Sequence, residues 1–124
     1  MASAGEGICM VSSKATFRDV GAVTIVDLSG MLMLGESSAV LREAILDLIG
    51  KRQGKIILNF RDVTSIDSAG VGELVAAYAA IKRIEGHVRL LNPPKKVCDM
   101  LELTQLSKVF QVYADEPSAL RSLD

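Results

Sequence analysis

The residues best placed to do chemistry are the hydroxyls, carboxylates and glycines between Asp62 and Gly72. They follow an apolar run typical of a buried strand and precede a helical pattern, and ligand sites in parallel sheets gather at such carboxyl ends. Asp67 or Ser68 can cap the helix, whose first N–H groups and positive dipole end favour an anion or a polar group of a partner. The same residues also form an ordinary helix cap. The chemistry of the segment therefore supports two interpretations, a structural cap and a small binding site.

Ser68 lacks the surroundings of a hydrolytic nucleophile. A nucleophile elbow has glycine two residues before the serine, and Ile66 stands there instead. The only histidine, His87, is expected to begin a strand, which in a parallel sheet places it at the opposite end from Ser68. We therefore expect no enzyme activity and a surface position for His87.

Cofactor chemistry is equally unsupported. Gly70 and Gly72 lack the third glycine of a dinucleotide-binding loop, and no Gly-Lys-Ser/Thr phosphate loop occurs. The two cysteines, Cys9 and Cys98, are too few and too far apart for a zinc site or a disulfide framework. We expect no cofactor and no metal, and we expect Cys98 to be a small buried hydrophobe.

The composition is that of a neutral globular chain. Its 124 residues are 49% hydrophobic and 23% charged, which predicts one domain spanning 1–124, with a core from about 8 to 123 and a flexible start at 1–7. The formal net charge is -1, and the basic residues are spread along the chain with three adjacent pairs in different segments, which argues against binding nucleic acid. No apolar run approaches the roughly 20 residues of a membrane span, and the N-terminus does not resemble a signal peptide. We expect a cytoplasmic monomer or weak dimer.

The elements that must position the segment alternate along the chain. Strands over 8–17 and 22–28 predict an antiparallel hairpin, followed by an apolar connection over 30–35. Four helices are then predicted: at 37–49, at 70–84, after Asn92 and at 116–123. Ser37 or Ser38 is expected to cap the first of them, and Asn92 the third. Strands are predicted at 55–60, 87–91 and 109–113. This alternation implies right-handed crossovers and an α/β domain whose mixed, mostly parallel sheet is covered by helices. The apolar stripe of the second helix is predicted to comprise Val71, Leu74, Val75, Tyr78 and Ile81.

The run from Ile66 to Gly72 resembles the Asp-Ser-(Ser/Thr)-Gly-(Leu/Val/Ile)-Gly signature of STAS domains, and especially that of bacterial anti-sigma factor antagonists. The resemblance covers nearly the whole chain. The hairpin that ends at Leu28-Ser29-Gly30, the strand Lys55–Phe60 and the turn at Asn92-Pro93 all fall in family order. It implies an N-terminal hairpin followed by βα repeats.

The resemblance also implies a non-catalytic regulator of transcription that works by partner switching. An unphosphorylated antagonist binds an anti-sigma factor that is also a serine kinase, and this frees the sigma factor. Phosphorylation adds about -1.5 to -2 charges to a packed contact surface, which separates the two proteins. The contact surface implied here comprises Ser65, Ile66, Asp67, Ser68, Ala69, Gly70, Val71, Gly72 and Glu73, together with Met31 and Met33.

The chain departs from the family at the phosphorylated position. The usual acceptor is the Ser or Thr directly before the first glycine, and here that residue is Ala69, which has no hydroxyl. Ser68 is the remaining candidate acceptor, but a shift of one residue at a helix start turns the side chain by about 100°. A kinase aligned on Ala69 should therefore transfer phosphate poorly to Ser68. Thr64 and Ser65 do not correspond to the family acceptor.

A second departure follows the hairpin. Many members carry Gly-x-Leu-Asp there, whereas this chain has Gly30-Met31-Leu32-Met33, so the acidic side chain is missing. The apolar run that results is either core or a contact patch with adaptable methionines.

Two other functions are compatible with these residues. One is a STAS subunit of a transporter or signalling assembly that has no phosphorylation switch, which Ala69 favours. The other is a small-molecule or nucleotide binder that uses the helix N-terminus as an anion site.

Overall fold

The strands and helices follow from the apolar runs and the turn residues between them. The computed structural model describes residues 13–32 and 36–123, and the side chains at 13–14, 31–32, 36–40 and 107 are outside that description. The elements in chain order are β1 (Ser13–Val20), β2 (Val23–Leu32), α2 (Glu36–Gly50), β3 (Lys55–Ile66), α3 (Ser68–Arg83), β4 (His87–Leu91), α4 (Lys95–Leu103), a 3-10 turn (Leu106–Lys108), β5 (Gln111–Tyr113) and α5 (Glu116–Arg121). Segment 1–7, the expected strand start at Ile8 and Cys9 lie outside the described residues.

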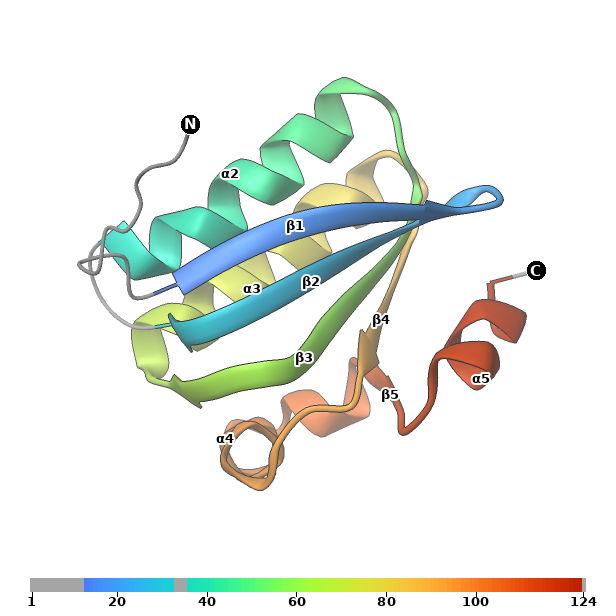
Figure 1. The fold of residues 1–124 in the computed structure, drawn as a ribbon. Coiled ribbons are helices and arrows are strands. Elements are labelled where there is room, and N and C mark those ends of the chain that lie inside the picture. The colour runs from blue at the N-terminus through green and yellow to red at the C-terminus, as the bar shows by residue number, and fades with distance from the viewer. Residues whose placement is uncertain (1–12, 33–35, 124) are drawn as a thin grey trace.

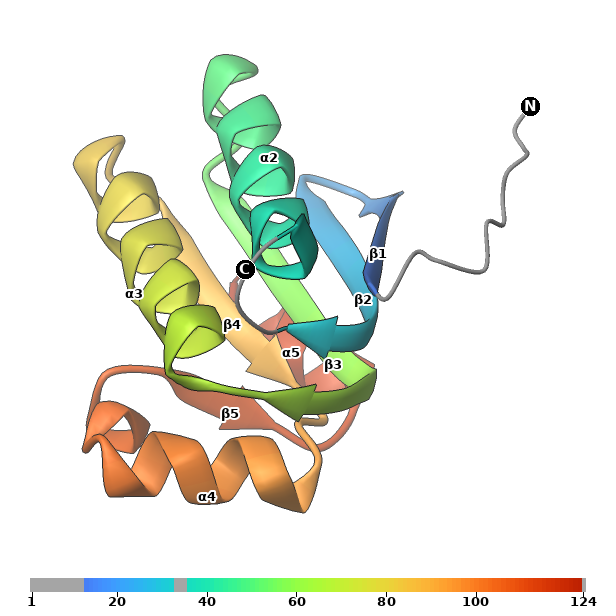
Figure 2. The same cartoon turned by 90° about the vertical axis from the view of Figure 1, so that its left-hand side faces the viewer.

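One five-stranded sheet organises the fold. Its strand order is β1-β2-β3-β4-β5, with β1 antiparallel to β2 and all the other pairs parallel. The helices α2 and α3 lie side by side on one face, and α5 lies over part of the other face (Figures 1 and 2). This is the predicted α/β arrangement, an antiparallel hairpin followed by right-handed crossovers.

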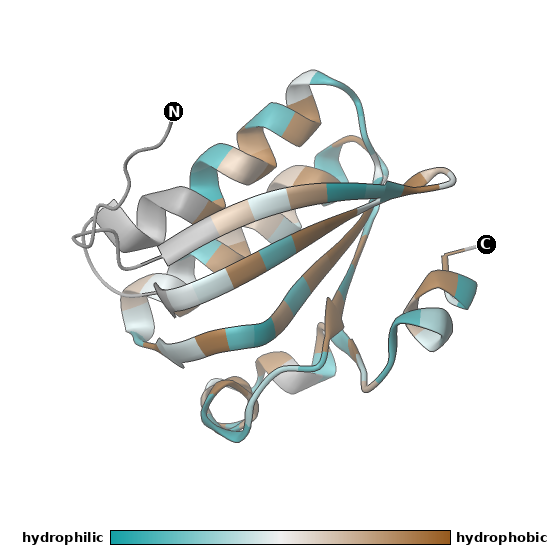
Figure 3. Ribbon diagram, viewed as in Figure 1, coloured by the Kyte–Doolittle hydropathy of each residue, from teal (hydrophilic) through white to brown (hydrophobic). Residues whose placement is uncertain are grey.

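The core lies mainly between the sheet and the pair α2 and α3. Successive side chains of a strand point to opposite faces, so the consecutive hydrophobic residues of β2 and β3, brown in Figure 3, supply both faces of the sheet. Ile56 and Leu58 belong to this main core, and Ile57 lies on the other face. The largest fully buried side chains of the main core include Leu28, Leu41, Leu58, Phe60, Leu74 and Ile81. A smaller cluster on the opposite face lies under α5 and comprises Val23, Ile25, Ile57, Leu91, Ala119 and Leu123.

β3 is longer than its sequence suggests. The prediction ended the strand at Phe60, whereas the strand runs to Ile66. The exposed pair Arg61-Asp62 interrupts the apolar run, but the backbone continues to pair with β2 through two register shifts. Such irregularities bend and twist a strand, and here they carry its end to the start of α3.

Several other boundaries also differ from the predictions. α2 begins at Glu36, so the expected cap residues Ser37 and Ser38 lie inside the helix. Pro94 rather than Asn92 precedes α4, because Asn92 has a left-handed backbone with φ 55°. Val75 is 39% exposed and is not part of the buried stripe of α3.

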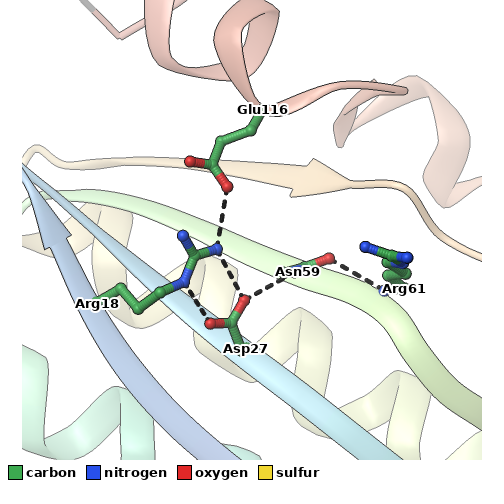
Figure 4. A network of polar contacts seen from close by, with 5 residues as sticks. All are labelled: Arg18, Asp27, Asn59, Arg61 and Glu116. Atoms are coloured by element: carbon green, nitrogen blue, oxygen red, sulfur yellow. Dashed lines mark hydrogen bonds and ion pairs between the residues drawn. The ribbon is translucent and has the colours of Figure 1, made fainter.

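A polar network ties α5 to the sheet. The Arg18 guanidinium donates to both carboxylate oxygens of Asp27, at 2.5 and 3.0 Å, and to Glu116 at 3.0 Å. The amide of Asn59 donates to Asp27 at 2.7 Å, and its oxygen accepts the backbone N–H of Arg61 (Figure 4). The Arg18 contact, aided by the Asn59 amide, holds the pKa of Asp27 below its usual value.

Candidate functional site

The candidate site begins where β3 becomes α3. Asp67 has an extended backbone, and its carboxylate accepts the Gly70 N–H at 3.0 Å. The Asp67 carbonyl accepts the Val71 N–H at 2.9 Å, which closes the first helical turn. Asp67 is therefore the N-cap, and Ser68 is the first residue of the helix. This decides which of the two residues caps the helix.

The residues around this cap differ in what they present to a partner. Ser68 and Gly72 are exposed, and the side chains of Ser65, Asp67, Ala69 and Glu73 are half-buried. Ile66, Gly70 and Val71 are buried and pack against the core. The exposed and half-buried residues are thus the accessible part of the predicted contact surface. The buried residues hold that part in position.

The end of β2 lies beside this segment. Met31 pairs with Ser65 and Leu32 with Ile66 in the parallel ladder, so the predicted proximity of the two segments is confirmed for the backbone. The Met31 side chain and all of Met33 lie outside the described residues. Whether the methionine run is core or contact patch therefore stays a prediction.

Sequence analysis missed an ion pair between α2 and α3. The Arg42 guanidinium contacts both oxygens of Glu73, with Nε–Oε1 at 3.1 Å and Nη2–Oε2 at 2.5 Å. This contact lowers the pKa of Glu73 below its ordinary value. The two residues are 31 positions apart, and no sequence pattern connects them. Only the packing of α2 against α3 brings them together.

An apolar groove continues from this ion pair along the two helices. It measures about 190 Å³ and is lined by Arg42, Ile45, Leu46, Glu73, Ala76, Ala77 and Ala80. Residues three and four apart share one side of a helix, so Ala69 lies on the same stripe of α3 as Glu73, Ala76 and Ala80. Ser68 is turned by about 100° from that stripe. The position of the family acceptor therefore adjoins the groove, and Ser68 does not.

The remaining predicted features can also be placed. His87 is exposed at the start of β4, where it pairs with Lys55 at the far end of β3 from Ser68. Cys98 is half-buried and not the buried hydrophobe that was predicted, and its thiol donates to the Pro93 carbonyl at 3.6 Å. Among the described residues, no group of three or more His, Cys, Asp or Glu side chains could hold a metal ion. No helix in that part of the chain is long and apolar enough to span a membrane.

Comparison with known proteins places these features in a family. The model of the STAS domain matches residues 14–119. The anti-sigma F factor antagonist of Paenibacillus polymyxa is 31% identical over 105 residues, which are 82% of this chain and 87% of that protein. The crystal structure of protein tm1081 from Thermotoga maritima superposes with a TM-score of 0.79 at 25% identity, over 88% of this chain and 93% of that one. The murine anion transporter Slc26a9 has a TM-score of 0.65 at 18% identity, over 86% of this chain and 18% of the transporter.

Proposed function

The chain belongs to the STAS domain family, and we propose that it is a non-catalytic, cytoplasmic antagonist that binds an anti-sigma factor with serine kinase activity. The observation that carries this proposal is the helix start at Asp67, where the family signature is capped and leaves Ser68 and Gly72 exposed. Relatives named anti-sigma factor antagonist support it, and the Paenibacillus polymyxa protein covers most of the chain.

The proposed contact surface consists of the accessible residues at the start of α3 and the end of β2. It comprises Ser65, Asp67, Ser68, Ala69, Gly72 and Glu73, with Met31 and Met33 as further proposed members. With little net charge on the chain, long-range attraction contributes little to binding, so recognition depends on short-range packing.

Ala69 distinguishes this chain from a switchable antagonist. Its side chain ends at the methyl group, so phosphate cannot be attached at the family position. Because Ser68 points away from the Ala69 stripe, we propose that it is a poor substitute acceptor. The chain would then bind its partner without being released by phosphorylation at this position.

A kinase assay tests the switch. We expect the intact mass of the wild-type chain to stay unchanged after incubation with the cognate kinase and ATP, and Ala69→Ser to gain one phosphate. A gain in the wild type that Ser68→Ala abolishes would instead assign acceptor function to Ser68. If Ala69→Ser binds the kinase but is not labelled, the proposed alignment with the family acceptor is wrong.

A pull-down from the native cell extract tests the binding surface. We expect the wild-type chain to recover a small ATP-binding kinase, and Ala69→Glu to recover much less because a carboxylate would stand in the packed contact. Ala79→Glu is the matched control, since Ala79 is exposed on α3 away from this surface. Equal loss with both variants would argue against a contact at Ala69.

The absence of a hydroxyl at Ala69 favours a second candidate, a STAS subunit of a transporter or signalling assembly without a switch. The likeness to Slc26a9 concerns the fold alone. The same pull-down separates the two functions, because recovery of membrane transporter subunits in place of a kinase would support the second.

A further inference from the structure

Basic residues that are far apart in the sequence meet at the end of the sheet where the parallel strands begin. α2 and α3 both end toward this side of the molecule (Figure 2), and a backbone hydrogen bond joins the turns that follow them. The His87 N–H donates to the Gly54 carbonyl at 2.6 Å, and Lys55 pairs with His87. The end of α3, the turn after α2 and the start of β3 therefore lie at one end of the fold. They carry the five cations here called the basic end: Lys51, Arg52, Lys55, Lys82 and Arg83. Two of the three adjacent basic pairs in the sequence thus lie at the same end of the fold, whereas Lys95-Lys96 lies in α4.

Most of these cations make no ion pair. Within residues 13–32 and 36–123, Lys51 is the one member with an ion pair, at 3.1 Å to exposed Asp47 one turn earlier in α2. Asp19, Asp47 and Glu85 lie among them, so five cations face three carboxylates in a chain of net charge -1. The dipole of α3 accounts for Lys82 and Arg83 in its last turn, but not for Lys55 at the start of a strand.

A cleft opens beside the basic end, between β1 and the end of α2. Its volume is about 340 Å³, and it is lined by Phe17, Asp19, Thr24, Leu48, Lys51, Arg52 and Gln53. Phe17 is 45% exposed although it pairs with fully buried Val26 in the ladder. Hydrogen bonds hold the residues at the base of the cleft in place. The buried Thr24 hydroxyl donates to Asp19 at 2.8 Å and accepts from Gln53 at 2.8 Å. The cleft thus offers an uncovered aromatic ring next to Lys51 and Arg52.

We propose that the basic end and this cleft bind an acidic protein segment whose apolar side chain packs on Phe17. Carboxylates of the segment would pair with the free cations, and the apolar side chain would cover the exposed part of the ring. The shape favours a peptide over a membrane, because Lys51 and Arg52 border a hollow whose lining also includes the carboxylate of Asp19. This surface lies at the opposite end of β3 from Ser68, so it is separate from the proposed antagonist surface and independent of that proposal.

Peptide selection tests the proposal without knowledge of the natural partner. Random 12-residue peptides displayed on phage are selected on the wild-type chain, on Arg52→Glu with Arg83→Glu, and on Lys96→Glu with Lys108→Glu. The last variant is the matched control, since it makes the same charge change at exposed lysines elsewhere. Circular dichroism confirms that all three chains fold.

We expect wild type and control to enrich the same acidic peptides containing an aromatic or branched aliphatic residue. Synthetic versions should bind the Arg52/Arg83 variant at least about tenfold more weakly at low salt, and the difference should shrink as salt is added. Phe17→Ala should weaken binding without changing the salt dependence. Failure to enrich acidic peptides, equal binding by the Arg52/Arg83 variant, or binding to phosphatidylglycerol vesicles in place of peptides would overturn the proposal.

Discussion

Gly72 lies near the start of α3 and Gly86 in the turn after its end. The fold of the unbound chain requires glycine only at position 86. A Cβ at Gly86 would lie 2.7 Å from the Gly54 carbonyl oxygen and 2.7 Å from the Cγ2 of Ile81. A Cβ at Gly72 would meet nothing within 4 Å. The turn at the basic end is therefore fixed by backbone packing, whereas the motif glycine has no packing reason in the free chain. The antagonist proposal assigns this exposed glycine to the contact with the partner.

The largest effect is expected for Gly86→Ala. The added methyl group would press on the Gly54 backbone, which cannot yield as a flexible side chain can, so the free energy of unfolding should fall by about 2–3 kcal/mol. Urea unfolding of the full chain measures this. Gly50→Ala is the control, because a Cβ there meets nothing within 4 Å. Equal stability of the two variants would contradict the claim that the fold requires glycine at position 86.

A smaller loss of stability is expected when the Asp67 cap at the start of α3 is removed. Asp67→Ala leaves the Gly70 N–H without its side-chain acceptor, which should lower the free energy of unfolding by about 1 kcal/mol. Asp67→Asn keeps an acceptor oxygen and should retain most of it. Ser68→Ala, at an exposed position, should change stability by less than about 0.5 kcal/mol. A larger loss for Ser68→Ala than for Asp67→Ala would show that the cap has been assigned to the wrong residue.

Gly72→Ala should raise stability at this same end. Alanine is favoured over glycine inside a helix by about 0.5–1 kcal/mol, and the site has room for the methyl group. If the antagonist proposal is right, the variant should nevertheless recover less partner in a pull-down. A stabilised chain that binds its partner normally would leave Gly72 with neither a structural nor a contact role.

The sequence predicted local features well and missed those that depend on packing between distant segments. Asp67 as a cap follows from its place between an apolar strand and a helical pattern, and the structure confirms it. The second half of β3 was missed because Arg61 and Asp62 interrupt the apolar run while the backbone pairing continues. The basic end was missed because the chain separates Lys51 from Lys82, and only the contact of two turns brings them to the same end of the fold.

The smallest effect concerns the Arg42–Glu73 pair beside Gly72. Because Arg42 holds the pKa of Glu73 below its ordinary 4.5, the pair stabilises the fold above that pH, and this contribution is lost as the pH falls through the lowered pKa. Glu73→Gln should thus be slightly less stable than wild type at pH 7, and the difference should vanish in acid and shrink in high salt. Urea unfolding over a series of falling pH values from 7 measures the difference, and Glu102→Gln, at an exposed carboxylate in α4, is the control. A difference that does not shrink as the pH falls would mean that Glu73 stabilises the start of α3 by packing and not by its charge.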